Sequence, residues 1–132
     1  MAIYLWIAVG SALGGISRYW FSGIVARSFG ETFPWGTLLV NVSGSLLIGI
    51  VAALTMPDGR IFIGSTARLA IMAGFLGGYT TFSSFSLQTM ALLQDGEWSL
   101  AGANIALSVL ACLAAVWAGY ALGNAFNAMK WI

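Results

Sequence analysis

The sequence contains no histidine, one cysteine and very few charged residues. Without histidine, the chain has neither an imidazole base nor an imidazole metal ligand. A single cysteine, Cys112, cannot form an internal disulfide or a thiolate cluster, and its apolar surroundings favour a small buried hydrophobe. Five basic residues are nearly balanced by four acidic ones, so the chain lacks the excess positive charge that a nucleic-acid-binding protein needs. These absences argue against a nucleic-acid-binding protein and against an enzyme, since no base is placed to activate a serine.

Hydrophobic residues, in contrast, make up 60% of the 132 residues, and charged residues only 7%. A soluble domain carries about 25% charged residues, so most of this surface is expected to face lipid. The length is that of one domain, residues 1–132. The N-terminus lacks the basic segment that opens a secretory signal, and we expect its apolar run to be retained as a membrane helix.

Charged residues divide the chain into four segments that are long enough to cross a bilayer as helices. A spanning helix needs about 20 mainly apolar residues. The four segments lie at about 2–26, 33–56, 69–94 and 98–129. We therefore predict an all-α membrane protein with four transmembrane helices per subunit, and with both termini on one side of the membrane.

The basic residues that orient membrane helices are nearly balanced between the two sides. Arg60, Arg68 and Lys130 fall on the side of the termini, whereas Arg27, and Arg18 if it reaches that way, fall on the other side. So weak a bias permits insertion in both orientations, which predicts dual topology. Four spans are also too few to enclose a pore comfortably, and we expect a dimer.

Small and polar residues recur at helical spacing in three spans. Gly10 with Gly14, and Gly119 with Gly123, form small-x-x-x-small pairs that let helices approach closely. Two stripes at spacings of four carry polar side chains: Thr37, Asn41 and Ser45 in the second span, and Asn104, Ser108 and Cys112 in the fourth. Each stripe fits either hydrogen bonding between packed helices or a shared hydrated path.

The third span contains the most distinctive stretch. Gly77 and Gly78 lie in the middle of an uncharged span and precede a run rich in hydroxyl groups, residues 79–86. Glycine is a poor helix former, so the pair predicts a broken helix. Carbonyl groups freed at membrane depth need a protein partner, a cavity or an ion. Neutral carbonyl oxygens suit a hard monovalent cation, or they can hold trapped water.

Two phenylalanines follow the break. Phe82 and Phe85 are three residues apart and are near neighbours on a helix. Their ring edges are positive and can attract a small anion, although ordinary packing explains the same spacing. Further neutral donors are available from Asn41, Thr81, Ser84 and Ser108. Many weak contacts of this kind suit a channel, which must replace the hydration of an ion and still release it.

Arg18 is the one charged residue inside an apolar span. An unpaired arginine at the membrane centre costs several kcal/mol, although its long side chain can reach toward the interface. We expect Arg18 either to line a water-filled vestibule that draws anions in, or to play a structural role.

Three segments together are similar to a known family. Residues 14–19 read GGISRY, residues 36–44 read GTLLVNVSG, and residues 77–86 read GGYTTFSSFS. Over the whole chain, the length, the four spans and the order of these motifs resemble the Fluc/CrcB family of bacterial fluoride channels.

The resemblance implies an antiparallel dual-topology homodimer with two pores, in the bacterial inner membrane. Fluoride leaving the cytoplasm would pass along Phe82 and Phe85, in contact with Asn41 and Ser84. A central structural sodium ion would be held by the backbone carbonyls of the broken helix. Those carbonyls belong to Gly77 and Thr80 of each subunit. We assign Thr81, Asn104 and Ser108 to the same path, the last two on the looser match of the fourth span.

Two other functions compete with this one. A proton-coupled dual-topology exporter needs a titratable carboxylate within the membrane, but Glu31, Asp58, Asp95 and Glu97 all fall in linkers. A non-transporting assembly subunit would use the polar stripes for packing only, which the hydroxyl-rich third span disfavours.

Overall fold

The computed structural model describes residues 1–129. Lys130, counted above among the basic residues on the side of the termini, lies outside the described residues. Within that range every regular element is a helix, which confirms the predicted all-α class. The elements are α1 (Ala2–Phe29), α2 (Trp35–Leu54), α3 (Ser65–Leu69), the π-helical η1 (Ala70–Leu76), α4 (Gly77–Tyr79), α5 (Phe82–Gln94) and α6 (Trp98–Ala128).

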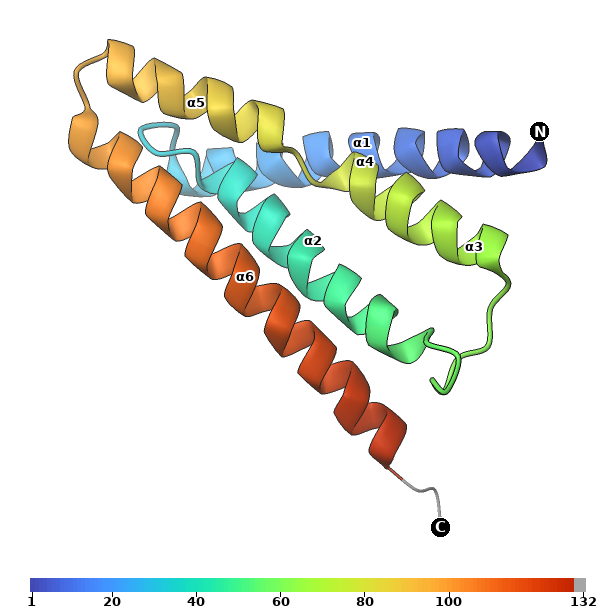
Figure 1. Cartoon of the computed structure of the whole chain (residues 1–132). Coiled ribbons are helices and arrows are strands. Elements are labelled where there is room, and N and C mark those ends of the chain that lie inside the picture. Colours follow the sequence, from blue (N-terminus) through green and yellow to red (C-terminus); the bar gives the residue numbers. More distant parts are fainter. Residues whose placement is uncertain (130–132) are drawn as a thin grey trace.

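The chain runs back and forth through the molecule, so that the start of α1 and the end of α6 lie toward the same side (Figure 1). α2 and α6 lie side by side and share the most extensive contact in the structure. α1 packs along η1 and α4, and α5 then continues beyond a short non-helical link. This arrangement places the link between α4 and α5 near the middle of the bundle.

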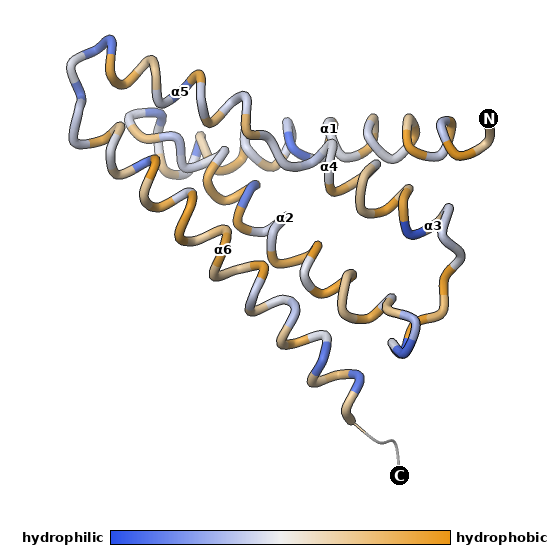
Figure 2. The backbone as a smooth tube through the Cα atoms, in the orientation of Figure 1, coloured by the Kyte–Doolittle hydropathy of each residue, from blue (hydrophilic) through white to orange (hydrophobic). Residues whose placement is uncertain are grey.

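Two helices of the described chain are long and apolar enough to cross a membrane, α2 and α6, each with a mean hydropathy of 2.1. Within the chain, only 28% of the 18-residue apolar stretch of α2 is buried, and only 11% of the corresponding stretch of α6. Figure 2 shows hydrophobic residues along most of both helices. Surfaces of this size and character need lipid or another subunit to cover them. Membrane crossing by α1 and by residues 65–94 stays a prediction.

Glycines allow the helices to approach closely in two places. A methyl group added at Gly14 of α1 would overlap the carbonyl oxygen of Phe75 in η1. One added at Gly119 of α6 would overlap the carbonyl oxygen of Leu46 in α2. Both glycines are buried, and each belongs to one of the small-residue pairs found in the sequence. The two main helix contacts therefore depend on backbone approach.

Replacing Gly14 with alanine should destabilise the protein, whereas Gly15→Ala should not. Both changes improve helix propensity equally, but nothing lies within 4 Å of a methyl group at Gly15. Overlap at Gly14 must separate α1 from η1, at a cost of about 1–3 kcal/mol. Melting temperatures of the two variants in detergent would test this, and equal values would contradict the close contact.

Polar contacts tie the turn after α2 to the end of α6. The backbone N–H of Arg60 donates to Oδ1 of Asn127 at 3.0 Å, and Nδ2 of Asn127 donates to the carbonyl of Ala53 at 2.9 Å. Nearby, Nε of Arg68 donates to Oγ1 of Thr55 at 2.9 Å. Arg60 and Arg68 thus lie at the end of the bundle that holds the termini, as the charge comparison assumed.

Candidate functional site

The helical path is interrupted at Thr80 and Thr81, two residues after the glycine pair on which the sequence placed the break. Gly77 keeps helical dihedrals (φ −64°, ψ −37°), whereas Thr80 (φ −80°, ψ 156°) and Thr81 (φ −151°, ψ 115°) are extended. Gly78 serves packing instead, because a methyl group there would lie 2.6 Å from the carbonyl oxygen of Ser11 in α1.

The side chain of Asn41, from α2, holds the extended segment with two hydrogen bonds. The backbone N–H of Thr81 donates to Oδ1 of Asn41 at 2.7 Å, and Nδ2 of Asn41 donates to the carbonyl of Thr81 at 2.9 Å. The amide therefore pairs with Thr81 as a neighbouring strand would. One of the two amide N–H groups that the sequence offered to an anion is consequently used here.

Four backbone carbonyls, those of residues 77 to 80, lose their helical donors at the interruption, and two of them belong to the residues proposed for the cation site. In a continuous helix, the N–H of Thr81 would donate to Gly77, and the N–H of Ser84 would donate to Thr80. The N–H of Thr81 donates to Asn41 instead, and that of Ser84 to Oγ1 of Thr81 at 3.2 Å. The carbonyls of Gly77 and Thr80 are left as neutral hard oxygen donors, which fit a monovalent cation. The described residues offer no group of three or more His, Cys, Asp or Glu side chains for another kind of metal.

An open groove of about 460 Å³ lies beside the interruption, between α2, the α4–α5 link and α6. No charged residue lines it. Its walls combine polar groups, two phenylalanines and aliphatic side chains: Asn41, Gly44, Ser45, Ile48, Leu76, Gly77, Thr80, Thr81, Phe82, Phe85, Ser108, Val109, Cys112 and Leu113. Seven of the ten residues proposed for the ion path, the cation site or the vestibule are thus brought together here. Ser84, Asn104 and Arg18, the vestibule residue, do not line the groove.

Phe82 and Phe85 both line the groove, with ring centroids 5.1 Å apart and ring planes at 50°. Phe85 is buried, whereas 76% of Phe82 is exposed in the single chain. The tilted rings present edges as well as faces, and the edges carry the positive part of the quadrupole. The pair is placed by the first turn of α5, which Thr81 caps through its side chain.

Ser84 lies outside the groove and contacts Arg18 and Thr81. Nη1 of Arg18 donates to Oγ of Ser84 at 3.5 Å, the long limit of a hydrogen bond. Oγ1 of Thr81 lies 3.1 Å from Oγ of Ser84. Nε of Arg18 and Oε1 of Gln88, one turn beyond Ser84, are buried without a hydrogen-bond partner among the described residues. Arg18 thus keeps a donor, and Gln88 an acceptor, that no described protein group uses.

Asn104 and Ser108 form a buried connection between α6 and α5. Nδ2 of Asn104 donates to Oγ1 of Thr89 at 2.9 Å, and Oγ of Ser108 donates to Oδ1 of Asn104 at 3.4 Å. Asn104 is 1% exposed and does not line the groove, whereas Ser108 does. Asn104 therefore contacts the groove only through Ser108. The sequence analysis missed Thr89, although its position one turn after Phe85 placed it on the same face of the helix.

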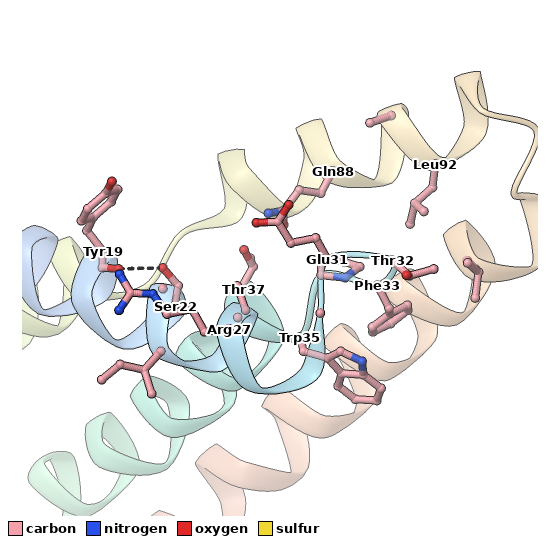
Figure 3. A pocket seen from close by; sticks show the side chains of 18 of the residues that line it. Tyr19, Ser22, Arg27, Glu31, Thr32, Phe33, Trp35, Thr37, Gln88 and Leu92 are labelled. Carbon is pink, nitrogen blue, oxygen red and sulfur yellow. Dashed lines mark hydrogen bonds between the residues drawn. The ribbon is translucent and has the colours of Figure 1, made fainter.

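A second, larger cavity of about 1160 Å³ opens where α1 ends, α2 begins and α5 passes over them. Figure 3 shows Arg27, Glu31, Thr37 and Gln88 around it. Asp95 and Glu97 line it too, so its charge is mixed. Arg18 does not line this cavity, and its role at a vestibule stays a prediction. The polar stripe of α2 runs from this cavity, at Thr37, to the groove, at Asn41 and Ser45.

Comparisons with known proteins agree with one another. The family described as CrcB-like protein, Camphor Resistance (CrcB), matches residues 5–120. A relative from Opitutus terrae is 55% identical over 130 residues, or 98% of each chain. One from Methylocella silvestris is 58% identical over 127 residues (96% of this chain, 97% of the relative), and one from Rhodospirillum rubrum is 56% identical over 117 residues (89% and 91%). All three are named fluoride-specific ion channel FluC.

Proposed function

This chain belongs to the CrcB-like family, and from that membership we infer that it is a fluoride-specific ion channel and not an enzyme. The observation that carries this function is the match, over nearly the whole chain, to relatives that bear that name. The groove beside Phe82 and Phe85 is where the described residues can accommodate a small anion, because it combines neutral donors with positive ring edges.

The chemistry of the groove suits conduction more than tight binding. No charged residue lines it, so an anion there meets only weak contacts. These are the remaining amide N–H of Asn41, the hydroxyls of Thr81 and Ser108, and the edges of the two phenylalanine rings. A compact, strongly hydrated halide needs many such contacts to replace its water, and each is weak enough to release it. Arg18 and Ser84 would present further donors outside the groove.

We propose that two antiparallel subunits complete two such paths. In the single chain the groove is open and Phe82 is largely exposed, so one subunit supplies only part of a wall. The small buried shares of α2 and α6 support a partner and lipid on their outer faces. The weak bias of Arg60, Arg68 and Lys130 against Arg27, with or without Arg18, is compatible with both orientations.

This arrangement makes the protein a multi-pass component of the bacterial plasma membrane with its subunits in both orientations. Tags fused to the termini should therefore be detected on both faces of the membrane in intact cells and in permeabilised ones. A single accessible face would contradict the antiparallel dimer without contradicting the channel.

We further propose that the carbonyl oxygens of Gly77 and Thr80 from both subunits hold a sodium ion at the dimer axis. Their lost helical donors support this, since the carbonyls of both residues lack the helical N–H partners that would otherwise use them. The carbonyls of Gly78 and Tyr79 lose theirs as well, and the choice of Gly77 and Thr80 among the four follows the family resemblance. The ion would supply a fixed positive charge that binds the two interruptions together. Fluoride flux should fall when sodium is removed from both sides and recover when it is returned, and unchanged flux would contradict the site.

Liposomes that contain only the purified protein should release trapped fluoride and retain chloride. We expect this selectivity because the neutral groove offers short contacts that a larger halide fills poorly. A fluoride-sensitive electrode and a chloride electrode would follow the two ions in matched vesicles. Vesicles that maintain their fluoride gradient would refute the channel. A proton-coupled exporter is not favoured, since Glu31, Asp58, Asp95 and Glu97 are all exposed in or beside the turns.

A further inference from the structure

Thr89 is one of only two buried residues in α5, and the other is Phe85. The two lie four residues apart on one face of α5. Thr89 contacts α6 there, through Asn104. The rest of α5 is exposed or partly exposed in the single chain. The position of this helix against α6 within one subunit therefore depends on these two residues and what they contact.

A chain of hydrogen bonds starts at the backbone of Phe85 and passes through Thr89. Oγ1 of Thr89 donates to the carbonyl of Phe85 at 2.8 Å and accepts from Nδ2 of Asn104 at 2.9 Å. Because the single hydroxyl hydrogen goes to Phe85, Thr89 can only accept from Asn104. That bond turns the oxygen of the Asn104 amide toward Ser108, whose hydroxyl donates to it at 3.4 Å.

The two ends of this chain lie in different walls of the groove. Phe85 lines the wall from α5, and Ser108 lines the wall from α6. The middle of the chain is withdrawn from the groove, since Thr89 is 7% and Asn104 1% exposed and neither lines it. α5 cannot rotate or slide along α6 without breaking the hydrogen bond between Asn104 and Thr89. Such a movement is opposed because a buried amide that loses its partner carries a desolvation cost.

We propose that Thr89 is a positioning residue of the ion path. Through Asn104 it fixes the ring of Phe85 opposite the hydroxyl of Ser108. The bond from Ser108 to Asn104 is long, and its hydroxyl can rotate toward an ion in the groove and return. Thr89 determines the position of the Ser108 hydroxyl through Asn104 and does not itself contact the ion. This role rests on the proposed channel function.

The test compares Thr89→Val, which keeps the shape and removes the hydroxyl, with Thr89→Ser, which keeps the hydroxyl. Asn104→Leu and the double variant complete a cycle, and Thr66→Val, at an exposed position of α3, is the matched control. Initial fluoride efflux is measured per reconstituted dimer over a range of fluoride concentrations. A purely structural role would lower the amount of folded dimer but not the flux through each one.

We expect Thr89→Val and Asn104→Leu each to reduce flux per dimer by about five- to tenfold, the equivalent of one net hydrogen bond. Thr89→Ser and Thr66→Val should stay within about twofold of the unmodified protein, and the double variant should be no worse than either single one. If Thr89→Val forms no dimer, the flux per dimer of the double variant is compared with that of Thr89→Ser instead, because the double variant buries no unpaired amide.

The positioning role is overturned if Thr89→Val conducts like the unmodified dimer, if Thr89→Ser is impaired as strongly as Thr89→Val, or if the two single effects simply multiply. If the unmodified protein itself releases no fluoride, the proposed function fails instead. The two failures are therefore distinguishable within one set of vesicles.

Discussion

Substituting isoleucine for Phe85 should reduce fluoride flux per dimer by roughly tenfold to a hundredfold, which corresponds to about 1.4–2.7 kcal/mol in the barrier. Phe85 is buried in the wall of the groove, and its ring lies 5.1 Å from that of Phe82. Isoleucine fills much of the same volume but has no positive ring edge, so the ion loses an attractive contact while the wall stays closed. Flux from proteoliposomes and elution of the dimer in detergent would be measured together.

The matched control is Phe126→Ile, which removes a partly exposed ring from α6 that lines neither cavity. Its flux should not change. Phe82→Ile should impair flux as Phe85→Ile does, because the second ring faces the same groove. If Phe85→Ile dimers conducted fluoride at the original rate, the ring edges would have no part in the path, and packing alone would explain the pair.

Removal of the Asn41 side chain amide should have a larger effect still. In Asn41→Leu, the N–H and carbonyl of Thr81 lose both partners in a partly buried position. Each unsatisfied group costs about 1–3 kcal/mol, and the extended segment would have to rearrange to satisfy them. Because that segment frees the carbonyls of Gly77 and Thr80, we expect flux per dimer to fall more than about a hundredfold and to need more sodium.

Asn124→Leu is the control, since it makes the same change at an exposed position of α6 that lines neither cavity. Asn41→Asp separates the two functions of the amide. Aspartate can still accept from the N–H of Thr81, but its other oxygen faces the carbonyl of Thr81 and its charge repels an anion. Flux that survived in Asn41→Leu would mean that the extended segment does not depend on this pairing.

The relation of Phe82 to Phe85 and the close helix contacts at Gly14 and Gly119 were predictable from the sequence. In each case the spacing along the chain decides the outcome, because residues three or four apart share a helix face. Seven of the ten residues proposed from the sequence line the groove, although what each one contributes to conduction stays a prediction. The all-helical class followed from composition and from the lengths of the apolar segments.

The place of the interruption was not predictable in this way. Low helix propensity placed it at Gly77 and Gly78, but both remain helical because the chain continues to pack on α1 through Gly78. The extended residues are Thr80 and Thr81, and Asn41 holds Thr81 from 40 residues earlier in the chain. A hydrogen bond over such a separation outweighs a local preference of about 1 kcal/mol.

The sequence by itself determined the helical class, the apolar character and the set of polar residues available for an ion path, because these depend on composition and on neighbours along the chain. Only the tertiary structure decided how those polar groups are used. Asn41 pairs with the backbone of Thr81, Asn104 turns toward Thr89, and Arg18 lies against Ser84. Such partners lie 15 to 66 residues apart, and packing of the helices alone brings them within bonding distance.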